Sequence, residues 1–305
     1  MNPLNRYTVA EETRQRVLEA AAALGYSPSM SARALRGKRE LVLAIIPDWP
    51  IGHSTSRFLS SLAEEMSARG LTFMVRYSSD DVAAHELLWR SMAPAAVLSF
   101  VEISAEKVDR ARAEGISVTM AFFDRRHETA NQIELPEDAT GRVQVEHLVA
   151  TGRRRLAIAL PLDERLAAFV VPRTEGVRDG CADLGLVAPV EITVALTPED
   201  GRRAVEDLIS QGIDGVCCYN DELALAIVAG AAACGIVVPD ELAVIGVDDD
   251  PVAAMYNPAL STVRLDVEHK AARIADAIVA GIKGDELTEL LDDREGITVI
   301  RRRTT

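Results

Sequence analysis

The chain has 305 residues, long enough for two domains, and its 48% apolar and 26% charged residues are ordinary for a globular protein. Its four cysteines show no paired spacing, which argues against a disulfide framework and favours a reducing, cytoplasmic location. The first residues lack the apolar core of a signal peptide, and the formal net charge is -14.

Charge is distributed unevenly along this acidic chain. Residues 1–40 hold seven Lys or Arg and four Asp or Glu, so they carry +3. The rest of the chain holds 26 cations and 43 acids, so it carries -17. A basic head in front of an acidic body indicates that the head is the part suited to a polyanion.

The first predicted element is an amphipathic helix over residues 8–25. Thr8 opens a T-x-x-E capping box, apolar side chains then recur at helical spacing, and Gly25 ends the helix. The basic, alanine-rich stretch Ser29–Glu40 follows and leads into the first apolar run. A helix as short as the one predicted over residues 8–25 is not stable alone in water, so it needs another surface to pack on.

From Leu41 onward, short apolar runs alternate with amphipathic helices. The runs predicted to be strands are 41–47, 72–77, 95–100, 117–122, 155–160, 190–195, 215–220 and 242–247, with later ones at 261–265 and 297–301. The helices between them include 56–69, 138–150, 199–211 and 221–234. Strands that are apolar on both faces and alternate with helices indicate parallel sheets covered on both sides.

The predicted strands are more than a single sheet usually contains. The predicted fold class is therefore α/β with two doubly wound parallel-sheet subdomains. The chain is expected to cross between the subdomains near 134–139, 264–267 and 289–294.

Polar and aromatic residues follow several of the predicted strands, at the sheet edge where ligands bind in such folds. These residues are Asp48, Trp49, Phe100, Asp124, Asn220, Asp221, Asp248, Asp249 and Asp250. Asp and Asn side chains bond hydroxyl groups, and Trp and Phe offer flat apolar faces. The combination predicts a cleft for a polar, sugar-like small molecule.

Common cofactor and catalytic motifs are absent from the sequence. It contains no G-x-G-x-x-G after a strand, no G-x-x-x-x-G-K-[ST], no G-x-S-x-G and no H-E-x-x-H, and its five histidines are scattered. We therefore expect no enzyme activity, no cofactor and no metal site. The acidic run 247–250 is interpreted as one inward ligand contact with two solvated acids.

One apolar run, Leu223–Val238, invites a membrane interpretation. It has 16 residues, fewer than the roughly 20 that span a bilayer, and it divides into a helix, Gly235 and a turn with Pro239. A buried helix is the preferred interpretation, so no membrane partner is expected.

Five stretches, in chain order, resemble the LacI/GalR family of bacterial repressors. They are "VAEETRQRVLEAAAALGYSPSMSARALRGKRELVLAIIPD", "GISVTMAFFD", "QVEHLVATGRRRLAIAL", "PRTEGVRDGCADLGL" and "CYNDELALAIVAGAAACGIVVPDELAVIGVDDDPVAAMYNPALSTV". The resemblance implies a type I periplasmic-binding-protein-like core preceded by a helix-turn-helix DNA-binding domain.

The domain boundaries that this resemblance implies begin with a helical remnant of the DNA-binding domain at 1–28, because only "MNPLN" precedes the first helix. A hinge helix or linker follows at 29–40. The core at 41–305 consists of an N-subdomain, about 41–136 and 266–290, and a C-subdomain, about 137–265 and 291–305.

The resemblance also implies site residues. The residues similar to the family's effector-binding positions are Trp49, Phe100, Asp124, Arg173, Asn220 and Asp248. Those similar to its DNA-binding hinge are Ser29, Arg33, Leu35, Arg36 and Lys38, with Leu35 expected to wedge into the minor groove of operator DNA.

The implied function is a DNA-binding regulator, a repressor, controlled by a small effector such as a carbohydrate. The resemblance also implies a homodimer, and a dimer is expected rather than a tail-linked tetramer, because "ITVIRRRTT" is followed by no leucine heptad. Two alternatives stay open: a sugar-binding protein of a transporter, and a regulator that no longer binds DNA. An enzyme that uses the strand-end acids is a third, supported by no nucleophile–base pair.

Overall fold

The computed structural model describes residues 13, 15–16, 19–20, 23, 39–78, 91–123, 132–135, 137–285, 289–290 and 294–305. The six described residues before Arg39 are helical and exposed, as the predicted helix over 8–25 requires at those positions. The predicted hinge positions from Ser29 to Lys38 lie outside the described residues.

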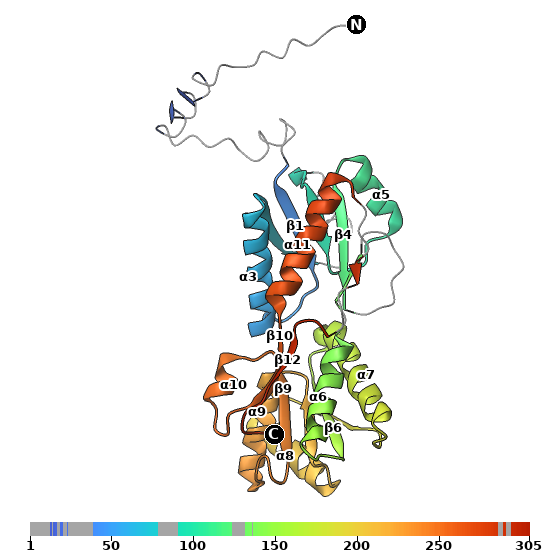
Figure 1. The fold of residues 1–305 in the computed structure, drawn as a ribbon, viewed down its shortest axis with the longest axis vertical. Coiled ribbons are helices and arrows are strands. Elements are labelled where there is room, and N and C mark those ends of the chain that lie inside the picture. Colours follow the sequence, from blue (N-terminus) through green and yellow to red (C-terminus); the bar gives the residue numbers. More distant parts are fainter. Residues whose placement is uncertain are drawn as a thin grey trace.

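The first subdomain is built on a six-stranded parallel sheet. In spatial order its strands are β11 (Glu289–Leu290), β5 (Gln132–Glu134), β4 (Ser117–Phe122), β3 (Ala96–Ser99), β1 (Leu41–Ile46) and β2 (Thr72–Tyr77). Its helices are α3 (His53–Ala68), α5 (Ala105–Ala113) and α11 (Val267–Lys283). Although α3 and α11 lie far apart in sequence, they pack side by side (Figure 1).

Helices cover both faces of this sheet, and the central strand β1 shows why. Alternate side chains of a strand point to opposite faces. Val42, Ala44 and Ile46 therefore pack in one core with α3 and α11, while Leu43 and Ile45 pack in a second core with α5. All six residues of β1 are buried, which is why this run is apolar throughout.

The second subdomain repeats this plan. In spatial order its strands are β12 (Ile297–Ile300), β10 (Ser261–Leu265), β9 (Ala243–Val247), β8 (Gly215–Cys218), β6 (Leu156–Pro161) and β7 (Val190–Val194). Only β12 runs antiparallel to its neighbour. The helices are α6 (Asp138–Ala150), α7 (Ala167–Asp183), α8 (Pro198–Ser210), α9 (Asp221–Cys234), α10 (Pro251–Met255) and the 3-10 turn η1 (Glu164–Leu166).

The predicted fold class is confirmed, and all ten predicted strands form within a residue or two of their expected ends. Two short strands were not predicted, β5 and β11, because three and two residues are too few to show a period. The chain passes between the sheets three times, between Glu134 and Asp138, between Leu265 and Val267, and between Leu290 and Ile297.

The apolar run from Leu223 is a helix of the second core, as expected. Helix α9 ends at Gly235, whose φ of 71° lies in the left-handed region that favours glycine. In the part of the chain that the structure describes, no helix combines the length and apolar character needed to cross a bilayer.

Helices α6 and α7 cross so closely that glycine is required at the contact. A Cβ at Gly176 would lie 1.8 Å from the backbone oxygen of Asp138, and a Cβ at Gly141 would lie 2.2 Å from that of Arg173. Side chains at these positions would push the two helices apart. The crossing matters for the site described below, because α7 carries Arg173.

We therefore expect Gly176→Ala to lower the free energy of unfolding by about 3 kcal/mol, through overpacking against backbone atoms that have no room to move. Urea unfolding monitored by circular dichroism measures this loss in the free energy of unfolding. Gly52→Ala is the control, because a Cβ there would meet no atom within 4 Å. Equal stability of the two variants would contradict the close crossing.

Candidate ligand-binding site

Two adjoining cavities lie where the carboxyl ends of the two sheets meet. The first has a volume of about 90 Å³ and is lined by residues that follow β1, β8 and β9, among them His53, Asn220 and Asp248. The second has a volume of about 50 Å³. The two share Ser54 and Thr55 of α3 in their walls, so they form one divided cleft.

Aromatic rings form one wall of the second cavity. Trp49, which follows β1, lies with its ring centroid 5.0 Å from that of Phe169, and Phe123, which follows β4, lies 4.4 Å from Phe169. Phe169 belongs to α7 of the second subdomain yet packs against the core of the first. Its ring therefore holds the two subdomains together across the cleft.

A buried carboxylate, Glu137, lies between two cations at the back of the same cavity. It accepts hydrogen bonds from Arg173 Nε at 3.0 Å and from Lys270 Nζ at 3.1 Å. The Glu137 side chain is 4% exposed, and those of its partners 9% and 14%. Because Lys270 lies on α11 and Glu137 directly precedes α6, this triad also joins the two subdomains.

Burial alone would raise the pKa of Glu137, but the charges of Lys270 and Arg173 together hold it below its usual value. Arg173 also donates from Nη1 to the backbone oxygen of Tyr219 at 2.9 Å, and its guanidinium lies 5.0 Å from the centroid of that ring. Burial acts to lower the pKa of Arg173, yet the charge of Glu137 raises it, so the guanidinium stays charged.

The first cavity contains Asp248, which follows β9 with a φ of 104°, an uncommon backbone conformation for a residue with a side chain. Burial raises the pKa of this carboxyl, and the charge of Arg173 acts in the opposite direction. Ser54 bonds its side chain, while its buried Oδ1 has no hydrogen-bond partner. Asn220 lines the same cavity, but its Oδ1 also caps α9 by accepting from Leu223 N at 3.0 Å.

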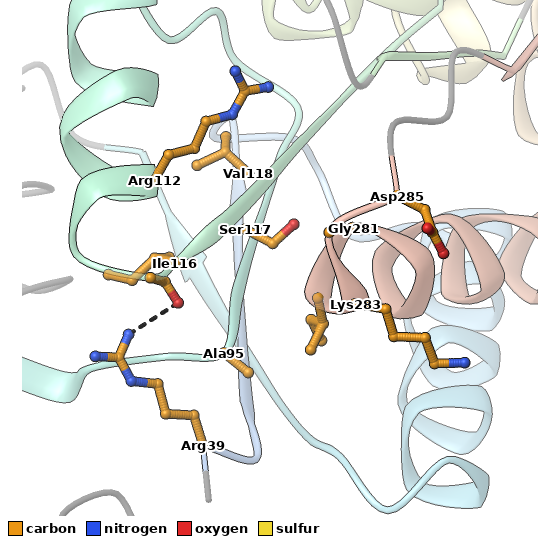
Figure 2. Close-up of a pocket in the computed structure, with 12 residues that line it drawn as sticks. Arg39, Ala95, Arg112, Ile116, Ser117, Val118, Gly281, Lys283 and Asp285 are labelled. Carbon is orange, nitrogen blue, oxygen red and sulfur yellow. Dashed lines mark hydrogen bonds between the residues drawn. The ribbon is translucent and has the colours of Figure 1, made fainter. Parts of the chain in front are cut away.

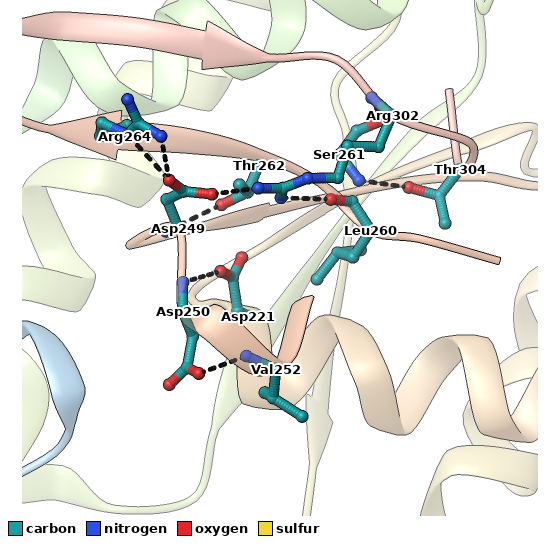
Figure 3. A network of polar contacts seen from close by, with 10 residues as sticks. All are labelled: Asp221, Asp249, Asp250, Val252, Leu260, Ser261, Thr262, Arg264, Arg302 and Thr304. Carbon is teal, nitrogen blue, oxygen red and sulfur yellow. Dashed lines mark hydrogen bonds and ion pairs between the residues drawn. The ribbon is translucent and has the colours of Figure 1, made fainter. Parts of the chain in front are cut away.

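For the run 247–250, the prediction of one inward-facing acid agrees with the structure, but the prediction of two solvated acids is wrong for Asp249. Asp248 does face inward, but Asp249 is not solvated, because Arg264 and Arg302 both bind it (Figure 3). Burial acts against ionisation, yet hydrogen bonds from Arg302 and Arg264 hold the pKa of Asp249 below its usual value. Asp250 caps α10 by accepting from Val252 N.

The structure brings four of the six predicted effector residues to the cleft. Trp49, Arg173, Asn220 and Asp248 line it or its wall. Phe100 does not line either cavity; its ring packs behind Trp49 at 5.3 Å. The sixth residue, Asp124, lies outside the described residues.

Sequence reasoning missed several cleft residues, among them Phe123, Glu137, Phe169 and Lys270. Phe123 had a detectable signal, because it directly follows a predicted strand. Glu137, Phe169 and Lys270 had none, because each lies in or beside a helix and reaches the cleft only through tertiary packing. Among the residues described, no cluster of His, Cys, Asp and Glu is arranged to hold a metal ion.

A larger cavity, about 620 Å³, lies elsewhere, at the end of the first subdomain beside Arg39. Arg39 Nη1 donates to the backbone oxygen of Gly115 at 3.2 Å. Figure 2 shows that the charged ends of Arg112 and Lys283 point away from each other and not into a common space. Because the charged groups of this larger cavity do not converge, we place the candidate site in the smaller, polar cleft between the subdomains.

Known proteins share this architecture. A family model described as a periplasmic binding protein-like domain matches residues 145–305. The chain is 30% identical to the HTH-type transcriptional regulator GntR of Pseudomonas aeruginosa, over 98% of this chain and 88% of the relative.

Two solved structures have the same fold. One is the lac repressor dimer bound to operator and the anti-inducer ONPF, with a TM-score of 0.78, 19% identity, and coverage of 98% of this chain and 91% of that chain. The other is a complex of the transcriptional regulator CelR with cellobiose, with a TM-score of 0.71, 19% identity, and coverage of 99% and 92%.

The triad predicts a large effect of one substitution. Glu137→Ala removes the carboxylate that neutralises two buried cations, so we expect it to lower the free energy of unfolding by about 3–5 kcal/mol. Glu206→Ala is the matched control. It removes an exposed partner of Arg202 on α8 and should cost less than about 1 kcal/mol. Chemical denaturation of both variants measures the difference, and similar costs would show that the triad contributes little.

Proposed function

The chain belongs to the LacI family of transcriptional regulators, whose effector domain resembles periplasmic binding proteins, and on this premise we propose that a small carbohydrate in the cleft controls its binding to operator DNA. The chain is thus a regulator and not an enzyme. The location that goes with this role is the cytoplasm, where the DNA is.

The composition of the cleft is the observation that carries the proposal. A sugar presents hydroxyl groups at its edge and an apolar face, and the cleft offers Asp248 and Asn220 for hydroxyls and the rings of Trp49 and Phe169 for that face. One of the structural neighbours was solved with the disaccharide cellobiose, which agrees with a carbohydrate effector.

Several contacts that cross the cleft would change when an effector enters. Phe169 packs on Trp49, Lys270 binds Glu137, and at the rim Arg165 bonds Asp48 at 3.2 Å. Together the cavities are smaller than a sugar needs, so entry requires the subdomains to move apart. An effector that binds one arrangement better shifts the equilibrium toward it.

The DNA-binding part of the proposal rests on residues 29–40. The hinge residues would be Ser29, Arg33, Leu35, Arg36 and Lys38, with Leu35 wedged at a base step and the cations near phosphates. Arg39, the second-last residue of this stretch, is bonded to Gly115 of the first subdomain. A movement of that subdomain would therefore reach the hinge directly.

We further propose a homodimer, supported by apolar side chains left exposed in both subdomains. The outer strand β2 exposes Met74, Val75 and Tyr77, and α10 exposes Val252 and Met255. An unpaired, apolar sheet edge is unusual in a monomer, because it promotes association.

The function is tested with DNA fragments selected from a randomised duplex library by the full chain. We expect an uncharged sugar from a panel of mono- and disaccharides to change affinity for the selected DNA at least about tenfold. Asp248→Asn should abolish that sugar effect with DNA binding retained, because Asp248 belongs to the cleft. Leu35→Ala should weaken DNA binding with sugar binding retained.

Fluorescence anisotropy measures the affinity for DNA, and calorimetry measures the affinity for the sugar. If no sugar in the panel alters DNA binding, or if Asp248→Asn responds like the parent, the proposed control mechanism is wrong.

The dimer is tested by sedimentation velocity. We expect the parent to sediment as a dimer and the double variant Tyr77→Glu/Met255→Glu as a monomer, because buried carboxylates would oppose each other across the interface. Val187→Glu is the control, an exposed apolar position before β7 that should leave the dimer intact. A tetrameric parent, or a dimeric double variant, would contradict the proposed interface.

A further inference from the structure

A strained turn joins the end of β9 to helix α10 beside the cleft. Of the described residues other than glycine, three have a positive φ, and two of them are the neighbours Asp248, at 104°, and Asp249, at 51°. A positive φ is uncommon for any residue with a side chain, and here it occurs twice in succession. Such strain persists only where surrounding contacts hold it, and it is concentrated at functional sites.

The backbone of this turn is bonded at each of its residues. The N–H of Asp248 donates to the backbone oxygen of Val263 at 2.9 Å, and that of Asp249 donates to the hydroxyl of Thr262 at 3.3 Å. The N–H of Asp250 donates at 2.7 Å to the carboxylate that begins α9. Strand β10 therefore holds the first two residues of the turn, and α9 holds the third.

Two arginines hold the side chain of Asp249 (Figure 3). Arg264 of β10 donates from Nε to Oδ2 at 2.8 Å, and Arg302, which follows β12, donates to Oδ1. Arg302 is itself fixed, because its Nη1 donates to the backbone oxygen of Leu260 at 2.8 Å and its N–H donates to Ser261 Oγ at 2.9 Å. We call Asp249, Arg264 and Arg302 the aspartate clamp. The side chains of Asp249 and Arg302 are 10% and 17% exposed, so water replaces their contacts only in part.

The aspartate clamp lies outside the cleft, while the residue next to it lies inside. None of its three residues lines either cavity, whereas Asp248 lines the first cavity together with Asn220. The peptide that joins Asp248 to Asp249 is planar, so only two backbone angles per residue remain free. A side chain anchored at Asp249 therefore limits the directions open to Asp248.

We propose that Arg264 and Arg302 are positioning residues of the candidate site. By binding Asp249 they hold the strained turn, and the turn directs the Asp248 carboxylate into the first cavity. Neither arginine contacts the effector. The inference rests on the proposed function only in taking Asp248 as an effector contact, and it makes the segment after β12 a determinant of effector affinity.

Two substitutions of Asp249 separate positioning from ordinary ion pairing. Asp249→Ala and Asp249→Gly both remove the carboxylate and leave the two arginines without it. Only glycine adopts a positive φ without steric cost, so we expect Asp249→Gly to keep the turn and Asp249→Ala to lose it. A role limited to ion pairing would affect both variants alike.

The direction of Asp248 is measured in the ligand-free full chain by its carboxyl carbon NMR shift during a pH titration, assigned with Asp248→Asn. Burial raises the pKa of Asp248 in the parent. In Asp249→Ala we expect this pKa to fall toward the ordinary aspartate value of about 3.9, because the side chain leaves the cleft, whereas Asp249→Gly should keep it raised. All variants in the titration keep the charged groups that face Asp248, namely Arg173, Glu137 and His53.

A second variant changes the charge in the opposite direction. Loss of two nearby cations would by itself raise the pKa of Asp248. In Arg264→Gln/Arg302→Gln we nevertheless expect this pKa to fall, because the turn is no longer held. The matched control is Arg301→Gln/Arg303→Gln, which removes two exposed arginines on either side of Arg302 and should keep the pKa of Asp248 raised.

Calorimetry of glucose, galactose, ribose, lactose and cellobiose with the full chain gives a second readout. For a sugar that binds the parent, we expect Asp249→Ala and Arg264→Gln/Arg302→Gln to weaken binding at least about tenfold, the range for a hydrogen bond to a charged group. Asp249→Gly should weaken it by no more than about fivefold, the cost of the freedom that glycine adds.

The outcomes separate the inference from the proposed function. A raised pKa of Asp248 in Arg264→Gln/Arg302→Gln overturns the inference, and so does equal behaviour of Asp249→Ala and Asp249→Gly. If Asp249→Ala does not fold, the arginine pair decides the question alone. If no sugar binds the parent, carbohydrate control loses its support, while the titration still decides whether the aspartate clamp positions Asp248.

Discussion

The buried carboxylate of Glu137 is the interaction on which the cleft depends. It holds Arg173 of α7 and Lys270 of α11, so one charged group joins elements of both subdomains. A carboxylate buried this deeply depends on both cations, since loss of either would leave part of its charge uncompensated. The triad thereby sets the spacing of the subdomains and removes two positive charges from those available to a ligand.

Aromatic packing works together with this ionic contact. The ring of Phe169 extends from the second subdomain and packs against Trp49 and Phe123 of the first. Protein atoms therefore fill the apolar part of the cleft. A ligand that separates the subdomains has to replace these contacts with its own. The arrangement is therefore suited to two discrete states, because a packed interface exchanges as a unit and does not deform gradually. Arg39, which directly follows the predicted hinge positions, is bonded to Gly115 of the first subdomain.

The cleft also separates charge along its length. Its apolar half contains the two cations that Glu137 neutralises, and its polar half contains Asn220 and Asp248. This polarity depends on which cations Glu137 and Asp249 have already engaged.

The sequence by itself determined the fold and most of the site's framework. Short runs apolar on both faces, such as Leu41–Ile46, form buried strands. Polar and aromatic residues placed after such strands lie in the cleft where the carboxyl ends of the two sheets meet, as Trp49 and Asp248 do. Only the tertiary structure decided which charges pair. Glu137 and Lys270 are 133 residues apart, and Phe169 projects from a helix, so no local spacing marks them. Local periodicity reports which face of an element is buried, but not which distant side chain it is buried against.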